Sequence, residues 1–105
     1  MSACLISLGQ ADGRRFITAK QLSKSKSASQ VQKSFVDNFA SQCGYCTPGF
    51  VTGIAACGSV AEREVELNGH ICRCTGYFPI KKAAKEAPIV DIEELAQLCA
   101  NCPRY

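Results

Sequence analysis

The sequence lacks any apolar run long enough to cross a membrane, and its beginning lacks the features of a secretory signal peptide. A transmembrane helix needs about 18 or more consecutive apolar residues, and no segment of this 105-residue chain approaches that length. Residues 1–8 have no basic segment and too short an apolar run for a signal peptide. We therefore expect a cytoplasmic protein without a membrane span.

A strong charge of one sign is also missing. The formal net charge is only +3 at pH 7, and lysines gather in two short stretches, at residues 20–33 and 81–85. Such runs usually form solvated surfaces, so this weak charge signal predicts no nucleic-acid partner.

Groupings of catalytic residues are absent as well. The chain has a single histidine, and we find no cysteine–histidine dyad and no paired carboxylates. It also lacks the glycine patterns that bind nucleotide phosphates. The sequence therefore predicts that this chain has no catalytic residues of its own.

Cysteine, in contrast, is abundant, at eight of 105 residues. In a secreted chain this density would indicate a disulfide scaffold, whereas in a reducing compartment it indicates metal binding or redox chemistry. A chain of this length buries only a modest apolar core, so a bound metal group would stabilise it substantially.

Four of the cysteines follow the pattern C-x2-C, then 25 residues, then C-x-C. They are Cys43, Cys46, Cys72 and Cys74. Four thiolates from two loops suit a [2Fe–2S] cluster, which takes two sulfurs on each iron. A structural zinc site also uses four cysteines, but its second half is usually C-x2-C. The spacing favours iron–sulfur and leaves zinc and unligated thiols as open alternatives.

Apolar spacing predicts a mainly α-helical domain over residues 29–88. Helices are expected at 29–41, where Val31, Phe35 and Phe39 recur at every fourth position, from Thr47 to Gly58, at 60–67, and from about 76 or 78 to 87. Both cysteine motifs end in Cys-Thr-(Pro)-Gly and an aromatic residue before a helix. This repetition predicts a four-helix bundle with pseudo-two-fold symmetry and a metal site where the two loops meet.

The rest of the chain divides into three parts. Residues 1–22 are expected to form two short strands of a β remnant, residues 23–28 a polar linker and residues 89–105 a tail. The tail ends in Cys99-x2-Cys102, which we expect to be free thiols because a preceding helix disfavours a thiolate. Cys57 is expected to be a small core residue.

Two segments together resemble the paired signature of the iron–sulfur subunit of molybdenum hydroxylases, the family of xanthine dehydrogenase and aldehyde oxidoreductase. They are QCGYCTPGF at 42–50 and GHICRCTGYFPI at 69–80, and the resemblance covers residues 1–88. It implies that the four cysteines hold the [2Fe–2S] cluster nearest the molybdopterin. It also implies that Gln42 hydrogen-bonds the pterin and that Cys74 contacts it through sulfur.

The resemblance implies an electron-transfer function. In this family a molybdenum centre hydroxylates a substrate, and the electrons leave through [2Fe–2S] clusters to FAD or another acceptor. The chain would be the iron–sulfur subunit of such an oxidoreductase, with a molybdopterin-binding large subunit and an FAD-binding subunit as partners. Two alternatives are a zinc-stapled interaction module and a docking or assembly remnant of the same family.

The sequence departs from the family pattern in four places. Residues 1–22 resemble only the last strands of the family's ferredoxin-like domain, and Cys4 stands at the position of that domain's fourth ligand. Either the rest of that domain lies on a separate ferredoxin-like chain, or this chain is a truncated remnant with one cluster. The interval between the two motifs is shorter than in the family. His70 replaces an asparagine and is expected to pack within its loop, and the C-terminal cysteine pair is extra.

Overall fold

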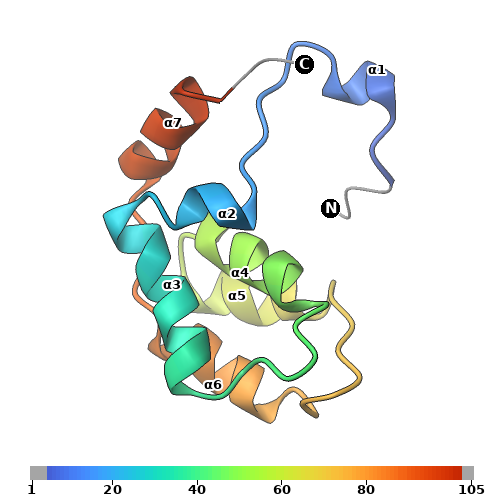
Figure 1. The fold of residues 1–105 in the computed structure, drawn as a ribbon, viewed down its shortest axis with the longest axis vertical. Coiled ribbons are helices and arrows are strands. Elements are labelled where there is room, and N and C mark those ends of the chain that lie inside the picture. The colour runs from blue at the N-terminus through green and yellow to red at the C-terminus, as the bar shows by residue number, and fades with distance from the viewer. Residues whose placement is uncertain (1–4, 103–105) are drawn as a thin grey trace.

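The computed structural model describes residues 5–102, which form seven α-helices and no strand (Figure 1). In chain order the helices are α1 (Leu8–Ala11), α2 (Ala19–Leu22), α3 (Lys26–Asp37), α4 (Thr47–Ala56), α5 (Val60–Leu67), α6 (Phe78–Glu86) and α7 (Ile92–Ala100). None of the helices in this described part of the chain is long and apolar enough to cross a membrane. The mainly helical class that the sequence predicts is confirmed.

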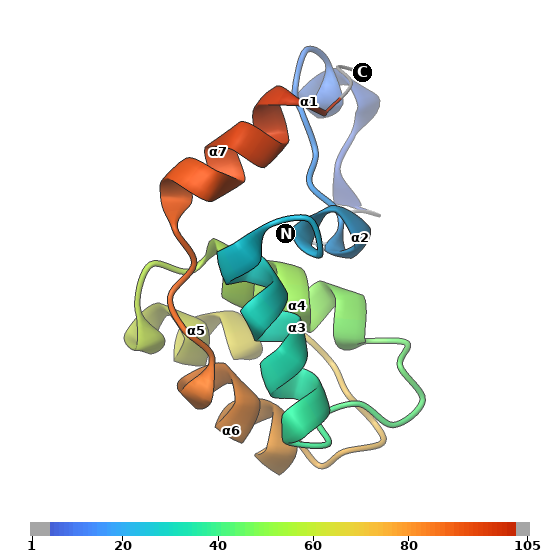
Figure 2. The ribbon, with the colours of Figure 1, turned by 60° about the vertical axis from the view of Figure 1, so that its left-hand side comes forward.

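Four of the helices close into a ring. α3 packs against α4 and α6, and α5 packs against the same two helices. The segments 38–46 and 68–77, which we call the cysteine loops, lead into α4 and α6 respectively. Figure 2 shows both cysteine loops on the same side of the ring.

α3 starts and ends earlier than the sequence predicts. Ser25 caps it, because the Ser25 side chain accepts a hydrogen bond from an N–H of the first turn. Val31 and Phe35 are buried as expected. Phe39, the third predicted member of this stripe, is 82% exposed. The prediction was wrong there because the helix has already ended and Phe39 has a positive φ of 52°.

The other helices of the ring lie close to their predicted positions. α4 carries Pro48 in its first turn, where a missing N–H costs no hydrogen bond, and Cys46 is its N-cap. α5 spans the predicted residues, and the Ser59 side chain caps its first turn. α6 ends before Ala87.

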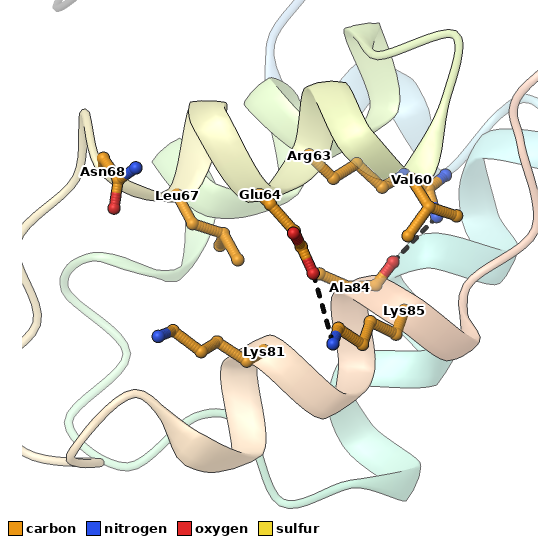
Figure 3. Close-up of a pocket in the computed structure, with 8 residues that line it drawn as sticks. All are labelled: Val60, Arg63, Glu64, Leu67, Asn68, Lys81, Ala84 and Lys85. Carbon is orange, nitrogen blue, oxygen red and sulfur yellow. Dashed lines mark hydrogen bonds and ion pairs between the residues drawn. The ribbon is translucent and has the colours of Figure 1, made fainter.

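A buried arginine joins α5 to the end of α6. The Arg63 side chain is 1% exposed, and its guanidinium donates hydrogen bonds to the carbonyl oxygens of Ala84, Ala87 and Pro88 at 2.8, 2.6 and 2.6 Å. Figure 3 shows the contact with Ala84 beside the hollow between the two helices. The last carbonyls of a helix lack partners within it and carry partial negative charge, so a buried cation stabilises this helix end.

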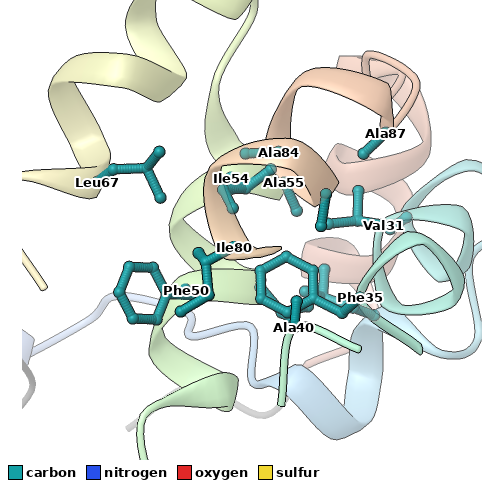
Figure 4. Packing of buried hydrophobic residues seen from close by; sticks show 14 of the residues in the cluster. Val31, Phe35, Ala40, Phe50, Ile54, Ala55, Leu67, Ile80, Ala84 and Ala87 are labelled. Carbon is teal, nitrogen blue, oxygen red and sulfur yellow. The ribbon is translucent and has the colours of Figure 1, made fainter. Parts of the chain in front are cut away.

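Apolar side chains from all four ring helices fill the centre of the molecule (Figure 4). α6 contributes the small residues Ala83 and Ala84, which are almost completely buried and let its neighbours approach closely. The larger buried side chains of these four helices are Val31, Phe35, Phe50, Val51, Ile54, Leu67 and Ile80. Each is worth about 1.5–3 kcal/mol relative to an exposed position, so this core holds the ring together.

The predicted β remnant at residues 1–22 is not confirmed. Residues 1–4, and with them Cys4, lie outside the described residues, and the following segment contains only the one-turn helices α1 and α2. Ser7 and Thr18 begin these helices through capping boxes. Two isolated strands are marginal in water, whereas a capping box satisfies two backbone N–H groups locally.

The tail forms α7, which contacts α2 and is tied to the start of α3. Glu94 accepts hydrogen bonds from the Ser25 hydroxyl at 2.6 Å and from the Ser27 N–H at 2.9 Å, and it also contacts the Ser27 hydroxyl. These bonds lower the pKa of Glu94 to about 2. Arg15 donates to the carbonyl oxygens of Cys99 and Ala100 at the other end of α7.

We expect Arg63→Met to lower the free energy of unfolding by about 3 kcal/mol, because it leaves buried carbonyl oxygens at the end of α6 without donors. Urea denaturation followed by circular dichroism measures this change. Lys33→Met is the matched control, since Lys33 forms an exposed ion pair with Asp37 that should contribute less than about 1 kcal/mol. Equal losses in the two variants would contradict the anchoring role of Arg63.

Candidate metal centre

The two cysteine loops bring the four predicted ligands together in two pairs. Cys43 of the first loop interacts with Cys74 of the second, and Cys46 interacts with Cys72. Within residues 5–102, no three Cys, His, Asp or Glu side chains are grouped closely enough to hold a single metal ion. The thiols therefore meet as two cross-loop pairs.

The two pairs differ in exposure. Cys43 and Cys74 are exposed, whereas Cys46 is half-buried and Cys72 is buried. Cys72 is also part of the apolar core, and Cys46 packs against that core. One side of the centre therefore faces the helical ring, and the other side faces outward.

The pKa values of the four thiols follow from these surroundings. A backbone N–H of its own loop lowers the pKa of Cys43, and the interaction with Cys43 raises the pKa of Cys74. Burial raises the pKa of Cys46 to about 11. The hydroxyl of Thr75 lowers the pKa of Cys72 to about 7, so the Cys72 thiolate is favoured although this residue is buried.

The backbone of the loops suits an anionic group. Gly44 and Gly76 have φ angles of 81° and 68°, in the left-handed region that glycine adopts without strain. α4 begins directly after Cys46, and α6 begins four residues after Cys74; neither helix has a hydrogen bond from a side-chain cap. The positive ends of two helix dipoles therefore lie next to the cysteines.

Tyr77 fastens the second cysteine loop. Its hydroxyl donates to the His70 carbonyl oxygen at 3.3 Å and accepts from the Cys72 N–H at 2.9 Å. Its ring meets Phe50 edge-on, with centroids 6.3 Å apart. The sequence alone did not identify this contact. The sequence signal that points to it is a tyrosine directly after Cys-Thr-Gly.

The sequence predicts that His70 packs within its loop, but its side chain packs against α4 and α5 instead. Its ring lies against Phe50, with centroids 4.8 Å apart, and its Nε2 lies 3.1 Å from Glu66 Oε1. Gly53 of α4 makes room for both side chains, because a Cβ there would lie 2.6 Å from Glu66 Oε1 and 3.0 Å from His70 Nε2. These contacts account for His70 without a role as a metal ligand.

Five other residues lie at or beyond the edges of the site. Gln42 and Arg73 are exposed on the first and second cysteine loops. Cys57 is buried at the end of α4, as predicted, and its thiol donates to the Gly53 carbonyl oxygen at 3.3 Å. Cys99 and Cys102 are free thiols at the end of α7.

Comparison with known proteins connects this geometry to a family. Residues 18–85 match the family described as the [2Fe-2S] binding domain. The chain is 34% identical over 107 residues to the nicotinate dehydrogenase small FeS subunit of Eubacterium barkeri, covering 96% of this chain and 63% of that subunit. It is 39% identical over 92 residues to the nicotine 6-hydroxylase small subunit of Paenarthrobacter nicotinovorans, covering 82% and 55%.

A much longer relative is also similar. The chain is 35% identical over 108 residues to the abscisic-aldehyde oxidase of Arabidopsis thaliana, and the similar region is 90% of this chain but 8% of that protein. The chain therefore spans less than two thirds of the length of each of these three relatives.

We expect Tyr77→Phe to raise the exchange rate of the Cys72 amide hydrogen about fivefold, because one hydrogen bond of about 1 kcal/mol is lost. Hydrogen–deuterium exchange followed by NMR measures this rate. Tyr45→Phe is the control, since the Tyr45 side chain is 94% exposed on the other loop. An unchanged rate in Tyr77→Phe would show that its hydroxyl does not fasten the loop.

Proposed function

This chain belongs to the [2Fe-2S] binding domain family, and from that premise we propose that it is the electron-transfer iron–sulfur subunit of a molybdenum-dependent hydroxylase. The observation that carries the proposal is the meeting of four thiols in two pairs across the cysteine loops. Two thiolates on each of two irons are what a [2Fe–2S] cluster requires. The proposed ligands are Cys43, Cys46, Cys72 and Cys74.

When bound, a [2Fe–2S] cluster accepts and returns one electron and becomes more negative by one charge on reduction. The residues of this chain offset that charge. The first turns of α4 and α6 present the positive ends of their dipoles to the site, and Arg73 adds a positive side chain on the second cysteine loop. The ring side of the site excludes water, because Cys72 and the neighbouring Phe50 are buried.

Exposed apolar side chains around the cysteine loops support docking to a larger subunit. Phe39, Tyr45, Ile71 and Phe78 lie on or beside these loops and are 77–94% exposed. A patch of this kind marks an interaction surface. We propose that it faces the molybdopterin-binding subunit, where Gln42 hydrogen-bonds the pterin and Cys74 contacts it through sulfur.

The relatives support a multi-subunit assembly. Two of them are named as small subunits, one of a nicotinate dehydrogenase and one of a nicotine 6-hydroxylase. We propose that this chain likewise serves an oxidoreductase whose molybdopterin and FAD are held by partner subunits. In this proposal the chain supplies no catalytic residue of its own.

The proposal also gives the extent and architecture of the cluster-binding domain. We propose that residues 29–88 form the cluster-binding domain, a four-helix bundle of two halves, α3 with α4 and α5 with α6. Each of these helices packs against one helix of its own half and one of the other half, which supports a single four-helix domain. A pseudo-two-fold axis between the halves would relate the two cysteine loops, each of which provides two thiols.

We expect alanine at any one of the four proposed ligands to remove the cluster and to destabilise the helical ring, because cluster binding and folding are coupled in a small chain. Visible absorption between about 400 and 600 nm, with iron and sulfide analysis, measures the loss. Cys99→Ala is the matched control, since Cys99 is a free thiol of α7.

Three outcomes separate this proposal from its rivals. A wild-type chain that is colourless and holds zinc would support the zinc-stapled interaction module. Bleaching by Cys99→Ala but not by Cys72→Ala would overturn the ligand assignment. Iron and sulfide in equal amounts, lost only in the four ligand variants, would support the proposal.

We expect Gln42→Ala to weaken binding to the molybdopterin-binding subunit about tenfold, because loss of one buried polar contact costs about 1–3 kcal/mol. Titration calorimetry with the purified subunit measures the affinity, and the visible spectrum of the cluster should stay nearly intact. Gln30→Ala is the control, since Gln30 is exposed on α3.

Equal affinity of Gln42→Ala and wild type would contradict the proposed pterin contact.

Electron transfer itself is tested by rapid-mixing spectroscopy of the assembled enzyme with its substrate. A cluster that stays oxidised through turnover would mean that the chain only docks, as a remnant of the family.

A further inference from the structure

Thr75 contacts a cysteine sulfur through its side chain. Its hydroxyl oxygen lies 3.0 Å from Cys72 Sγ and 3.2 Å from the backbone nitrogen of Tyr77. Because a backbone N–H can only donate, Thr75 Oγ1 accepts the bond from Tyr77 and keeps its own proton for the sulfur. A cysteine bound to iron is deprotonated and can only accept, so the direction of the bond is determined in the loaded protein.

The surroundings of Cys72 strengthen this contact. Cys72 is 7% exposed, so water competes little for its sulfur. The loop is also held in place, because the Tyr77 hydroxyl accepts from the Cys72 N–H at 2.9 Å. Hydrogen bonds to an ionised acceptor are about twice as strong as those between neutral groups. The Thr75 hydroxyl is therefore a strong and well-oriented donor to this sulfur.

The equivalent threonine of the first cysteine motif has a different hydrogen-bond partner. Thr47 follows Cys46 just as Thr75 follows Cys74 in the repeated motif. The Thr47 hydroxyl lies 2.9 Å from the Ser41 hydroxyl. The two halves of the site are therefore unequal, because the threonine of one half contacts a cysteine and the threonine of the other contacts a serine.

We propose that Thr75 is a positioning residue that raises the reduction potential of the cluster through its hydrogen bond to the Cys72 sulfur. The inference rests on the proposed function. Reduction adds one electron to the cluster, with no proton transferred and no bond to Cys72 formed or broken. A hydrogen-bond donor stabilises the more negative, reduced form more than the oxidised form, and bonds to the sulfurs are one of the factors that set the potential.

The experiment compares midpoint potentials of the full chain loaded with iron and sulfide, measured by anaerobic dithionite titration with visible and EPR detection. Thr75→Val keeps the shape of the side chain but removes the hydroxyl. We expect its potential to fall by about 59 mV, a tenfold change in the equilibrium constant of a one-electron couple. Thr75→Ser keeps the hydroxyl and should stay near wild type. Thr47→Val, the matched control, should also stay near wild type.

An unchanged potential in Thr75→Val, or equal falls in Thr75→Val and Thr47→Val, would overturn the inference. If Thr75→Val takes up no cluster, the potential of Thr75→Ser tests the inference instead. A loaded Thr75→Ser with the wild-type potential supports the hydroxyl, whereas an empty one, or one with a shifted potential, overturns the inference. A wild-type chain that binds no iron and sulfide would contradict the proposed function itself, so the two failures are distinguishable.

Discussion

The placement of the second cysteine loop depends on how α6 is held at its two ends. At the C-terminal end, the buried guanidinium of Arg63 donates to three carbonyl oxygens. Before the N-terminal end, the Tyr77 hydroxyl joins the carbonyl of His70 to the N–H of Cys72 within the loop, and the Tyr77 ring meets Phe50 of α4 edge-on. Because Arg63 of α5 contacts one end of α6 and Phe50 of α4 contacts the other, the two contacts together oppose sliding or turning of α6. The loop that leads into α6 is therefore held opposite the first cysteine loop.

The two ends of α6 also face groups of opposite charge in the proposed loaded protein. The C-terminal end of a helix carries partial negative charge and its N-terminal end partial positive charge. Arg63 provides the cation at the C-terminal end from a position that is 1% exposed. An anionic cluster on the cysteine loops would provide the opposite charge at the N-terminal end. The polarity of the helix thus favours a cation at one end and the proposed cluster at the other.

The ring helices and the four cysteines could be predicted because their signals are local, either a helical period or a short spacing. The end of α3 could not, since Phe39 continues the apolar period but the chain has to turn into the first cysteine loop there. The strands failed for another reason, because their pairing needs partner strands that the described residues do not provide. The contacts of Arg63 join residues 21–25 positions apart, and such pairs leave no periodic trace.

The repeated Cys-Thr motif shows how a small sequence difference makes similar halves chemically unequal. After Thr47 comes proline, which suits the first turn of a helix, so α4 begins at Thr47 itself. After Thr75 comes Gly76, whose φ of 68° interrupts any helix, so α6 begins only at Phe78. Thr47 is therefore part of a helix, whereas Thr75 lies in a bend that returns its hydroxyl to a cysteine sulfur. The threonine of the first motif begins a helix, and the threonine of the second provides a hydrogen-bond donor to a cysteine of the site.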